Sequence, residues 1–388
     1  TTLSASKTLL ISIPTHLACS RNWENMTVSP VPVTNVKSRV LVAGATGFIG
    51  QFVVEASLSS GRPTYVLVRP GSGSPSKEKV ISSLQEKGAI ILHGSINDKE
   101  GMVKMLKEQE IDIVISAVGG STILHQLTLV EAIKEAGTVK RFLASEFGHD
   151  VDRADPVAPG LTMYLEKRRV RRSIEENNVP YTHICCNSIA SWPYYDNCHP
   201  SEVLPPLDRF QIYGDGTVKA YFVAGTDIGK FTVKTLDDVR TLNKVVHFRP
   251  ASNFYNVNEL ASLWERKIGR KLPRVTVTEE ALLALAAENR FPESIVASFT
   301  HDIFIKGCQS NFAVDGPTDV EATELYPEEP FRTLDDCFGE FAARLNDTVG
   351  ATKNCDDNVH VGCDVKPSLL VDQPPTVAAA QAGAALHC

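Results

Sequence analysis

Two hydrophobic periods alternate along residues 38–190, and their alternation predicts a strand–helix repeat. Short apolar runs rich in β-branched residues occur at 39–43, 63–68, 89–94, 112–118, 139–145 and 180–186. Segments with apolar residues at helical spacing lie between them, at 51–60, 77–87, 99–110, 124–136 and 161–177. Strands that alternate with helices form a doubly wound parallel sheet. The pattern therefore predicts an α/β Rossmann fold over residues 38–190.

The pattern changes after residue 190 and predicts a second, smaller lobe over residues 191–345. A loop rich in aromatics and prolines at 192–206 precedes clear helices at 258–269 and 279–289. We expect this lobe to be mainly helical and to bind substrate, and we expect residues 219–250 to return to the first domain. The 192–206 loop suits a pocket for a flat aromatic ligand. Aromatic side chains packed beneath a long loop would give the same pattern.

Both ends of the chain lack a folding pattern. Residues 1–37 are predicted to be a disordered preface. The first 23 residues carry no acidic side chain and many Ser and Thr, so a plastid transit peptide is the alternative. Residues 346–388 are predicted to be a low-complexity tail, with prolines and an alanine-rich end. The tail cysteines Cys355 and Cys363 lack the spacing of metal ligands, so no metal site is predicted.

The first apolar run ends in a glycine-rich turn, Gly44-Ala45-Thr46-Gly47-Phe48-Ile49-Gly50, and a helix follows at once. Strand, glycine turn and helix in succession form a cradle for a pyrophosphate. Gly44 permits the tight turn, Gly47 lets the anion approach, and Gly50 lets helix and strand pack closely. The spacing is GxxGxxG, and a plain strand–helix turn is the alternative. In this context we expect Gly44, Thr46, Gly47, Phe48, Ile49 and Gly50 to bind a dinucleotide.

The end of the second strand indicates which dinucleotide is bound. Arg69 stands where an NAD-preferring unit would carry an acidic residue, and arginine accommodates a 2′-phosphate. Lys77 and Lys79 follow in a Gly/Ser/Pro loop, where a solvated basic loop is the alternative, above all for Lys79. The fourth strand ends in Gly119-Gly120, so backbone can approach the cofactor at Gly119 or simply turn there. The predicted cofactor is NADPH.

Composition narrows the class of partner. The formal charge of −7 argues against a nucleic acid or an anionic membrane, both of which favour basic surfaces. No apolar run reaches the length of a membrane helix. Nine cysteines without a small-domain framework indicate reduced thiols, and we therefore expect a cytoplasmic protein.

Two titratable residues are expected at the carboxyl edge of the sheet, where ligands gather. His149 follows the fifth strand and is suited to proton exchange, although a lone histidine there is often structural. Lys167 lies in the middle of the apolar stripe of the 161–177 helix, between Met163 and Val170. A lysine on an inward face needs a partner or a role, and desolvation would depress its pKa. A side chain that snorkels from the edge of the stripe is the alternative.

With these residues assembled, residues 26–345 resemble the plant isoflavone-reductase-like group of atypical short-chain dehydrogenase/reductases, which is NmrA-like. Within it the chain is similar to the leucoanthocyanidin reductase family. The resemblance is carried by the glycine turn, Arg141-Phe142-Leu143, Ser145 to Gly148, Ile184-Cys185-Cys186-Asn187 and Thr300-His301-Asp302. Without this resemblance, Thr300-His301-Asp302 could be either a functional site or a local helix cap. The family has proline where this chain has Ala144, which puts the rigidity of the catalytic loop in doubt.

The resemblance implies an NADPH-dependent oxidoreductase of flavonoid and proanthocyanidin biosynthesis. It would reduce leucoanthocyanidins, flavan-3,4-diols such as leucocyanidin, to 2,3-trans-flavan-3-ols such as catechin. Lys167, which would also contact the cofactor, takes a phenolic proton in the implied mechanism, and His149 protonates the departing water or positions the diol. Hydride then adds at C4. Tyr164, His149 and Asn187 would contact this small-molecule substrate.

Two alternatives stay open at this point. One is a related phenylpropanoid reductase that acts on an isoflavone, a lignan or a benzylic ether. The other is a non-catalytic NADP-sensing regulator, against which a lysine on the inward helix face argues.

Overall fold

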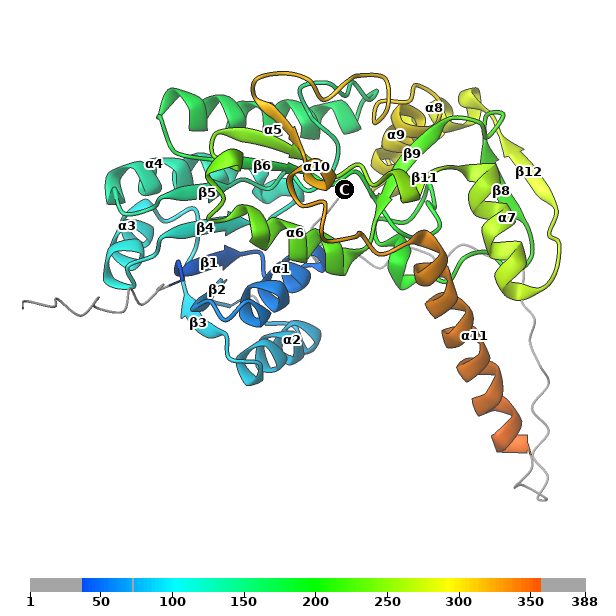
Figure 1. Cartoon of the computed structure of the whole chain (residues 1–388), viewed down its shortest axis with the longest axis horizontal. Coiled ribbons are helices and arrows are strands. Elements are labelled where there is room, and N and C mark those ends of the chain that lie inside the picture. The colour runs from blue at the N-terminus through cyan, green and yellow to red at the C-terminus, as the bar shows by residue number, and fades with distance from the viewer. Residues whose placement is uncertain (1–36, 72, 357–388) are drawn as a thin grey trace, which may run out of the picture. The chain divides into compact units, whose positions relative to one another are not determined.

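A five-stranded parallel sheet forms the centre of the first domain in the computed structural model, which describes residues 37–71 and 73–356 (Figure 1). The strand order is β3-β2-β1-β4-β5. The order reverses between β1 and β4, which is the point where doubly wound sheets bind ligands. The strands are β1 (Val40–Ala43), β2 (Thr64–Val68), β3 (Ile90–His93), β4 (Ile113–Ser116) and β5 (Arg141–Leu143).

A three-stranded parallel sheet continues this arrangement past β5. A parallel bridge between Phe142 and Tyr181 links β5 to the start of β6 (Thr182–Cys185). β6 pairs with β10 (Lys244–His247), which pairs in turn with β13 (Asp319–Glu321). The β10 strand, from within residues 219–250, thus pairs with β6 from the first 190 residues.

Helices cover both faces of the five-stranded sheet, as the near-continuous apolar strands require. Val40 and Val42 of β1 pack on one side with residues of α1 (Phe48–Ser59), α2 (Pro75–Glu86) and α6 (Gly225–Thr235). Leu41 and Ala43 pack on the other side with α3 (Lys99–Glu108), α4 (Gln126–Ala136) and α5 (Gly160–Glu176). α6 lies against α1 at Gly229, where a Cβ would stand 2.3 Å from the Phe52 carbonyl oxygen.

The smaller lobe combines helices with short strands. β8 (Phe210–Tyr213) pairs with β12 (Arg274–Val277), and β9 (Lys219–Val223) lies between β7 (Ser188–Ile189) and β11 (Phe254–Asn256). Buried Trp192, Trp264 and Phe338 belong to the same apolar cluster as Leu41, so the lobe's core is continuous with one face of the sheet. Its helices are α7 (Val257–Ile268), α8 (Glu279–Ala287), α9 (Glu293–Phe304), α10 (Ala322–Leu325) and α11 (Leu334–Asp356).

The Thr300-His301-Asp302 motif lies inside the continuous helix α9, because buried apolar residues at helical spacing run on through Phe304. Two boundaries differ from the expectations. Residues 120–125 form a 3-10 turn ahead of α4. Helix α11 continues to Asp356, past the expected end of folded structure at residue 345. The rest of the predicted tail and residues 1–36 of the preface lie outside the described residues.

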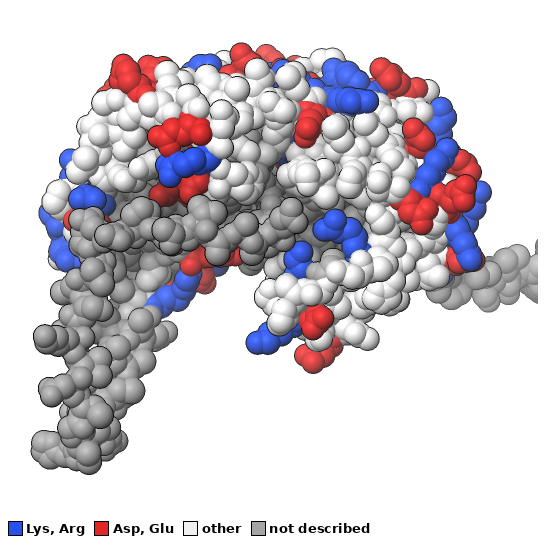
Figure 2. Space-filling model, turned by 180° about the vertical axis from the view of Figure 1, so that it is seen from behind, with Lys and Arg blue, Asp and Glu red and all other residues white. Residues whose placement is uncertain are grey.

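The described surface carries mixed charge. Figure 2 shows Lys and Arg interspersed with Asp and Glu over the face that it presents. Among the described residues, no helix combines the length and the apolar character that crossing a membrane requires.

Candidate active site

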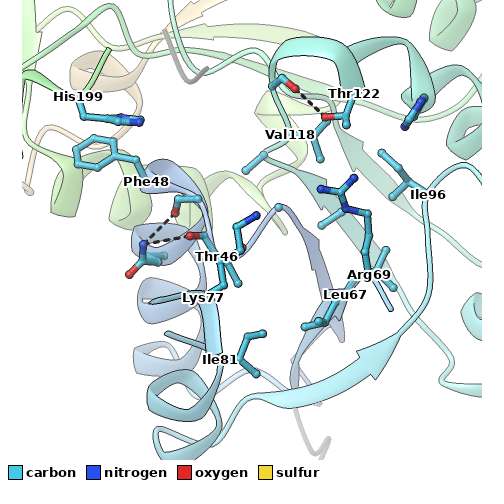
Figure 3. Close-up of a pocket in the computed structure, with 18 of the residues that line it drawn as sticks. Thr46, Phe48, Leu67, Arg69, Lys77, Ile81, Ile96, Val118, Thr122 and His199 are labelled. Atoms are coloured by element: carbon cyan, nitrogen blue, oxygen red, sulfur yellow. Dashed lines mark hydrogen bonds between the residues drawn. The ribbon is translucent and has the colours of Figure 1, made fainter. Parts of the chain in front are cut away.

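A cavity of about 300 Å³ opens at the carboxyl ends of β1, β2 and β4. The structure brings to it seven of the predicted cofactor residues from segments far apart in the sequence (Figure 3). This is the switch point of the sheet, so the cavity stands where a doubly wound fold binds its ligand. The seven residues are Gly44, Thr46, Gly47, Phe48, Arg69, Lys77 and Gly119.

The glycine turn needs its glycines for two different reasons. Gly44 has a φ of 82°, and a Cβ there would lie 2.3 Å from the Ala117 carbonyl oxygen. A Cβ on Gly50 would lie 2.2 Å from the Gly44 carbonyl oxygen, so any side chain would push α1 off the turn. No side chain caps the start of α1 at Gly47, which leaves its first N–H groups to an anion.

Two cationic side chains enter the cavity from different elements. Arg69 follows β2, and Lys77 lies in the first turn of α2. Figure 3 shows the guanidinium and the amine extending toward the same space. Lys79 does not line the cavity and is exposed, which fits the solvated alternative for that residue. A phosphate group bound in the cavity would therefore meet positive charge.

Three residues predicted to bind the cofactor do not line this cavity. Gly50 packs against Gly44 instead, where its missing Cβ allows the close approach. Ile49 points the other way along the first turn of α1 and lines a second pocket. Lys167 is buried beneath the loop after β5.

A second pocket, of about 80 Å³, lies next to the first. Consecutive residues of α1 separate the two, since Phe48 lines the cavity and Ile49 the pocket. The loop after β7 also separates the two spaces, because His199 lines the cavity while Cys198 and Pro200 line the pocket. The Phe48 and His199 rings lie together at this boundary, with centroids 5.6 Å apart (Figure 3). Ligands in the two spaces would therefore be neighbours.

The second pocket is mainly apolar and contains two of the three predicted substrate residues, His149 and Asn187. Asn187 donates its side-chain N–H to the Phe248 carbonyl and its backbone N–H to Gly148 O at 3.0 Å, which ties β6 to the loop after β5. Such a lining suits a flat aromatic molecule with few hydrogen-bonding groups. The remaining walls are Phe147, Ser188, Ile189, Pro193, Tyr194, Asn197, Val296, Phe299, Thr300, Ile303 and Phe304.

Lys167 is on the buried face of α5, as its helical spacing predicts. Its side chain is 5% exposed, and Met163, Val170 and Ile174 are buried on the same helix. The Nζ atom donates to the Glu146 carbonyl oxygen at 2.8 Å. The snorkelling alternative is therefore wrong, because the amine is held inside the protein at the end of β5.

A buried ion network that the sequence reading missed fixes this loop. Arg171, 1% exposed, donates to the carboxylates of Glu146 at 2.9 Å and Asp150 at 2.7 Å. These carboxylates raise the pKa of Arg171 against the opposing effect of its burial. Phe147, between them, has a φ of 32°, a conformation that non-glycine residues rarely adopt. The ion network stabilises this strained backbone. The signal in the sequence is that Arg171 lies four residues after Lys167 and therefore on the same face of the helix.

His149 is buried beside Tyr164, the third predicted substrate residue. Its Nδ1 shares a 2.5 Å hydrogen bond with the Tyr164 hydroxyl. Burial, followed by the charge of Lys167, lowers the pKa of His149 to about 3, so the imidazole is neutral at physiological pH. When Tyr164 donates to Nδ1, the ring proton stands on Nε2 and is available as a donor. Tyr164 itself does not line the pocket and acts on it through His149.

One cluster among the described residues has the makings of a metal site. Ligand atoms of Asp150, Cys185 and His247 lie within 4.8 Å of one another. Arg171 donates to Asp150 and to the Cys185 sulfur, and His247 Nε2 shares a 2.9 Å hydrogen bond with Asp319. A guanidinium already pairs with these ligand atoms, and its charge opposes a metal ion at this point.

Residues 36–338 match the family described as the NmrA-like family. The chain belongs to the NmrA-like family. A leucoanthocyanidin reductase of Desmodium uncinatum is 66% identical to this chain over 329 residues, which is 85% of this chain and 86% of that protein. A phenylcoumaran benzylic ether reductase of Ginkgo biloba is 44% identical over 306 residues, 79% of this chain and 99% of that protein.

Solved structures are similar to this chain as well. A binary complex of leucoanthocyanidin reductase with NADPH from Vitis vinifera is 69% identical, with a TM-score of 0.77, and covers 79% of this chain and 100% of that chain. A ternary complex of leucoanthocyanidin reductase from the same plant is 68% identical, with a TM-score of 0.75 and the same coverage. The Rossmann architecture predicted from the alternating pattern is confirmed.

Proposed function

We propose that the chain is an NADPH-dependent reductase that converts flavan-3,4-diols such as leucocyanidin to 2,3-trans-flavan-3-ols such as catechin. The observation that carries this proposal is the arrangement of two adjoining spaces, a phosphate-binding cavity and a small apolar pocket, that meet at Phe48 and Ile49. The leucoanthocyanidin reductases at 66% and 69% identity support the substrate class and its place in flavonoid biosynthesis.

The cavity fits the cofactor on its own geometry. The glycine turn leaves room for a pyrophosphate at the start of α1, and Arg69 with Lys77 supplies charge for a 2′-phosphate. Gly119 and Thr46 complete the lining. Bound NADPH supplies the hydride that C4 of the flavan accepts.

The chain's own residues manage protons and position the diol. Lys167 takes the proton of a phenolic hydroxyl, which drives loss of the C4 hydroxyl, and it returns that proton after reduction. The departing hydroxyl leaves as water with a proton that comes ultimately from solvent. Because His149 is neutral, it acts as a hydrogen-bond donor that positions the diol rather than as an imidazolium acid. Tyr164 orients that ring, and Asn187 completes the polar side of the pocket.

The domains divide this work. In the proposal, residues 38–190 with 219–250 hold the cofactor, and residues 191–345 close over the substrate. The segment 198–202 contributes to both spaces, since His199 and Glu202 line the cavity while Cys198 and Pro200 line the pocket.

We also infer a cytoplasmic enzyme whose partners are small flavonoids, without nucleic acid or membrane. The described cysteines Cys185, Cys186, Cys308 and Cys337 are free thiols, which suits a reducing compartment. The charge of −7 disfavours polyanionic partners.

The test is product analysis with the purified chain. Incubated with leucocyanidin and NADPH, it should form a flavan-3-ol that chromatography against a catechin standard identifies. A phenylcoumaran benzylic ether tested in parallel addresses the relatives at 44% identity and should be turned over far more slowly. Reduction of the ether but not of the diol would contradict the proposal. NADPH binding without turnover of either would favour the regulator alternative.

A further inference from the structure

Most polar side chains around the 80 Å³ pocket already have partners inside the protein. Ser188 Oγ accepts from Gln309 Nε2 at 2.7 Å, and the Tyr194 hydroxyl donates to the Leu204 carbonyl at 2.6 Å. Asn197 bonds through both side-chain atoms to the backbone of His199. These groups shape the pocket wall and are committed to it. In a mainly apolar pocket, the polar groups that remain uncommitted decide which ligand fits.

Thr300 on α9 is such a group. The residue is 4% exposed, and within the described residues its hydroxyl has no hydrogen-bond partner, although it lines the pocket. A helical threonine commonly bonds to the carbonyl four residues earlier, but no such bond to Val296 exists here. Val296 and Ile303, on the same side of α9, line the pocket as well, so this face of the helix is directed into it.

The neighbours of Thr300 in the Thr300-His301-Asp302 motif have structural roles. His301 Nε2 shares a 2.8 Å hydrogen bond with Glu279, which ties α9 to α8. The Asp302 carbonyl oxygen accepts the backbone N–H of Cys308 at 3.1 Å, in the segment that follows the helix. Neither residue lines the pocket, so Thr300 alone brings this motif to the ligand.

When a bound ligand excludes water from the pocket, a hydroxyl left without a partner is unfavourable, and a hydrogen bond to that ligand removes the penalty. A second polar atom is available nearby. His149 bonds to Tyr164 through Nδ1, and its Nε2 has no partner within the described residues. The pocket therefore presents two separate hydrogen-bonding groups on an apolar surface, which matches an aromatic ligand with more than one hydroxyl.

We propose that Thr300 is a specificity-determining residue whose hydroxyl hydrogen-bonds to an alcohol or phenol group of the polyphenol bound beside His149. The inference rests on the proposed function, because it takes the 80 Å³ pocket as the polyphenol site. A site that offers a hydrogen bond to a ligand hydroxyl discriminates against analogues without that hydroxyl, because its own polar group is then left unpaired. Thr300 thus favours ligands that carry a hydroxyl group at this point over ligands of the same size that lack it.

The test compares Thr300→Val, which has the same shape without the hydroxyl, with the matched control Thr300→Ser, which keeps it. The probe is (+)-catechin, titrated into each protein saturated with NADP⁺ and followed by calorimetry. We expect Thr300→Val to raise the Kd for catechin by about five- to tenfold, the effect of one lost hydrogen bond. Thr300→Ser should stay within about twofold of the wild type, and the NADPH affinity should be unchanged in both variants.

Thermal melting separates this role from a structural one. Removal of a hydroxyl that has no partner within the described residues leaves stability unchanged or raises it, so Thr300→Val should melt at or above the wild-type temperature. Equal catechin affinity in Thr300→Val and wild type would overturn the inference, as would a wild type that does not bind catechin. Failure of the wild type to reduce leucocyanidin would contradict the proposed function instead, since the catechin titration needs no turnover.

Discussion

The cofactor cavity and the substrate pocket adjoin each other but are built in different ways. The cavity depends on backbone, because a contiguous turn from Gly44 to Gly50 supplies its floor and the start of α1 supplies its N–H groups. The pocket depends on side chains from four separate segments, around Ile49, Phe147, Asn187 and Phe299. The buried ion pairs of Arg171 with Glu146 and Asp150 then fix the loop after β5, whose Glu146 carbonyl oxygen accepts from the Lys167 amine. The cofactor cavity should therefore be sensitive to an added Cβ on its glycines, whereas the pocket should be sensitive to the loss of a buried charge beside it.

The largest effect is expected at Lys167. Lys167→Ala should lower kcat by about 10²- to 10⁴-fold, because proton transfer by a positioned side chain contributes that much, while the Kd for NADPH changes little. Steady-state kinetics and a fluorescence titration of NADPH measure the two quantities. Arg169→Ala, on the exposed face of the same helix, is the control and should keep wild-type kcat. Undiminished turnover in Lys167→Ala would mean that the lysine is only structural.

The ion network comes next. Arg171→Met leaves the Glu146 carboxylate buried and unpaired and leaves Asp150 with only its ion pair to Arg153, which should lower the free energy of unfolding by about 3–5 kcal/mol. Arg172→Met removes an exposed side chain from ion pairs with Asp152 and Glu175 and should change stability by about 0–1 kcal/mol. Urea unfolding of both variants gives the comparison. Equal losses would show that the buried network does not support the site.

The glycine turn should respond to a single methyl group. Gly44→Ala combines a positive φ with a collision at the Ala117 carbonyl, so it should destabilise the protein by about 2–4 kcal/mol and weaken NADPH binding. Gly137 has a similar φ of 67°, but a Cβ there would meet open space. Gly137→Ala should therefore lower the free energy of unfolding only by the cost of the positive φ, about 1 kcal/mol. If the two variants unfold at the same urea concentration, the close contact between Gly44 and the Ala117 carbonyl is not the reason that the turn needs a glycine.

A decrease in pH should destabilise the protein through the buried side chain of His183. Burial, with the charges of Arg171 and Arg172, lowers the pKa of His183, and both ring nitrogens lack partners within the described residues. The unfolded chain takes up this proton below pH about 6.5 while the folded protein does not, so stability falls as the pH decreases from that value. His183→Phe should therefore lose about 1–2 kcal/mol less than the wild type between pH 7.5 and 5.0. Parallel urea titrations at the two pH values test this difference.

The smallest effect is expected at the rim of the cavity. Arg69→Gln should raise the Kd for NADPH by about three- to tenfold and leave the Kd for NADH nearly unchanged, because only NADPH carries the 2′-phosphate. Lys79→Gln, exposed and outside the cavity, should affect neither. A parallel weakening of both dinucleotides by Arg69→Gln would argue against a contact with the 2′-phosphate.

The same contrast explains what the sequence could predict. A contiguous motif carries its own geometry, so the residues from Gly44 to Phe48 and the fold that surrounds them could be read directly. Helical spacing placed Lys167 on the buried face. The pocket could not be assembled in this way, because Thr300, Phe147 and Asn187 meet only through tertiary packing. Arg171 was overlooked because an arginine is rarely buried unless it is paired, and its partners lie 21 and 25 positions away.

The central claim is that a ligand in the cavity and a ligand in the pocket touch across Phe48 and Ile49. Transfer of deuterium from NADPH labelled at the nicotinamide C4 tests it most directly, with the flavan-3-ol product analysed by mass spectrometry and NMR. The account predicts one deuterium at C4 of the product, from one face of the nicotinamide only. A flavan-3-ol that carries no label from either face would contradict it.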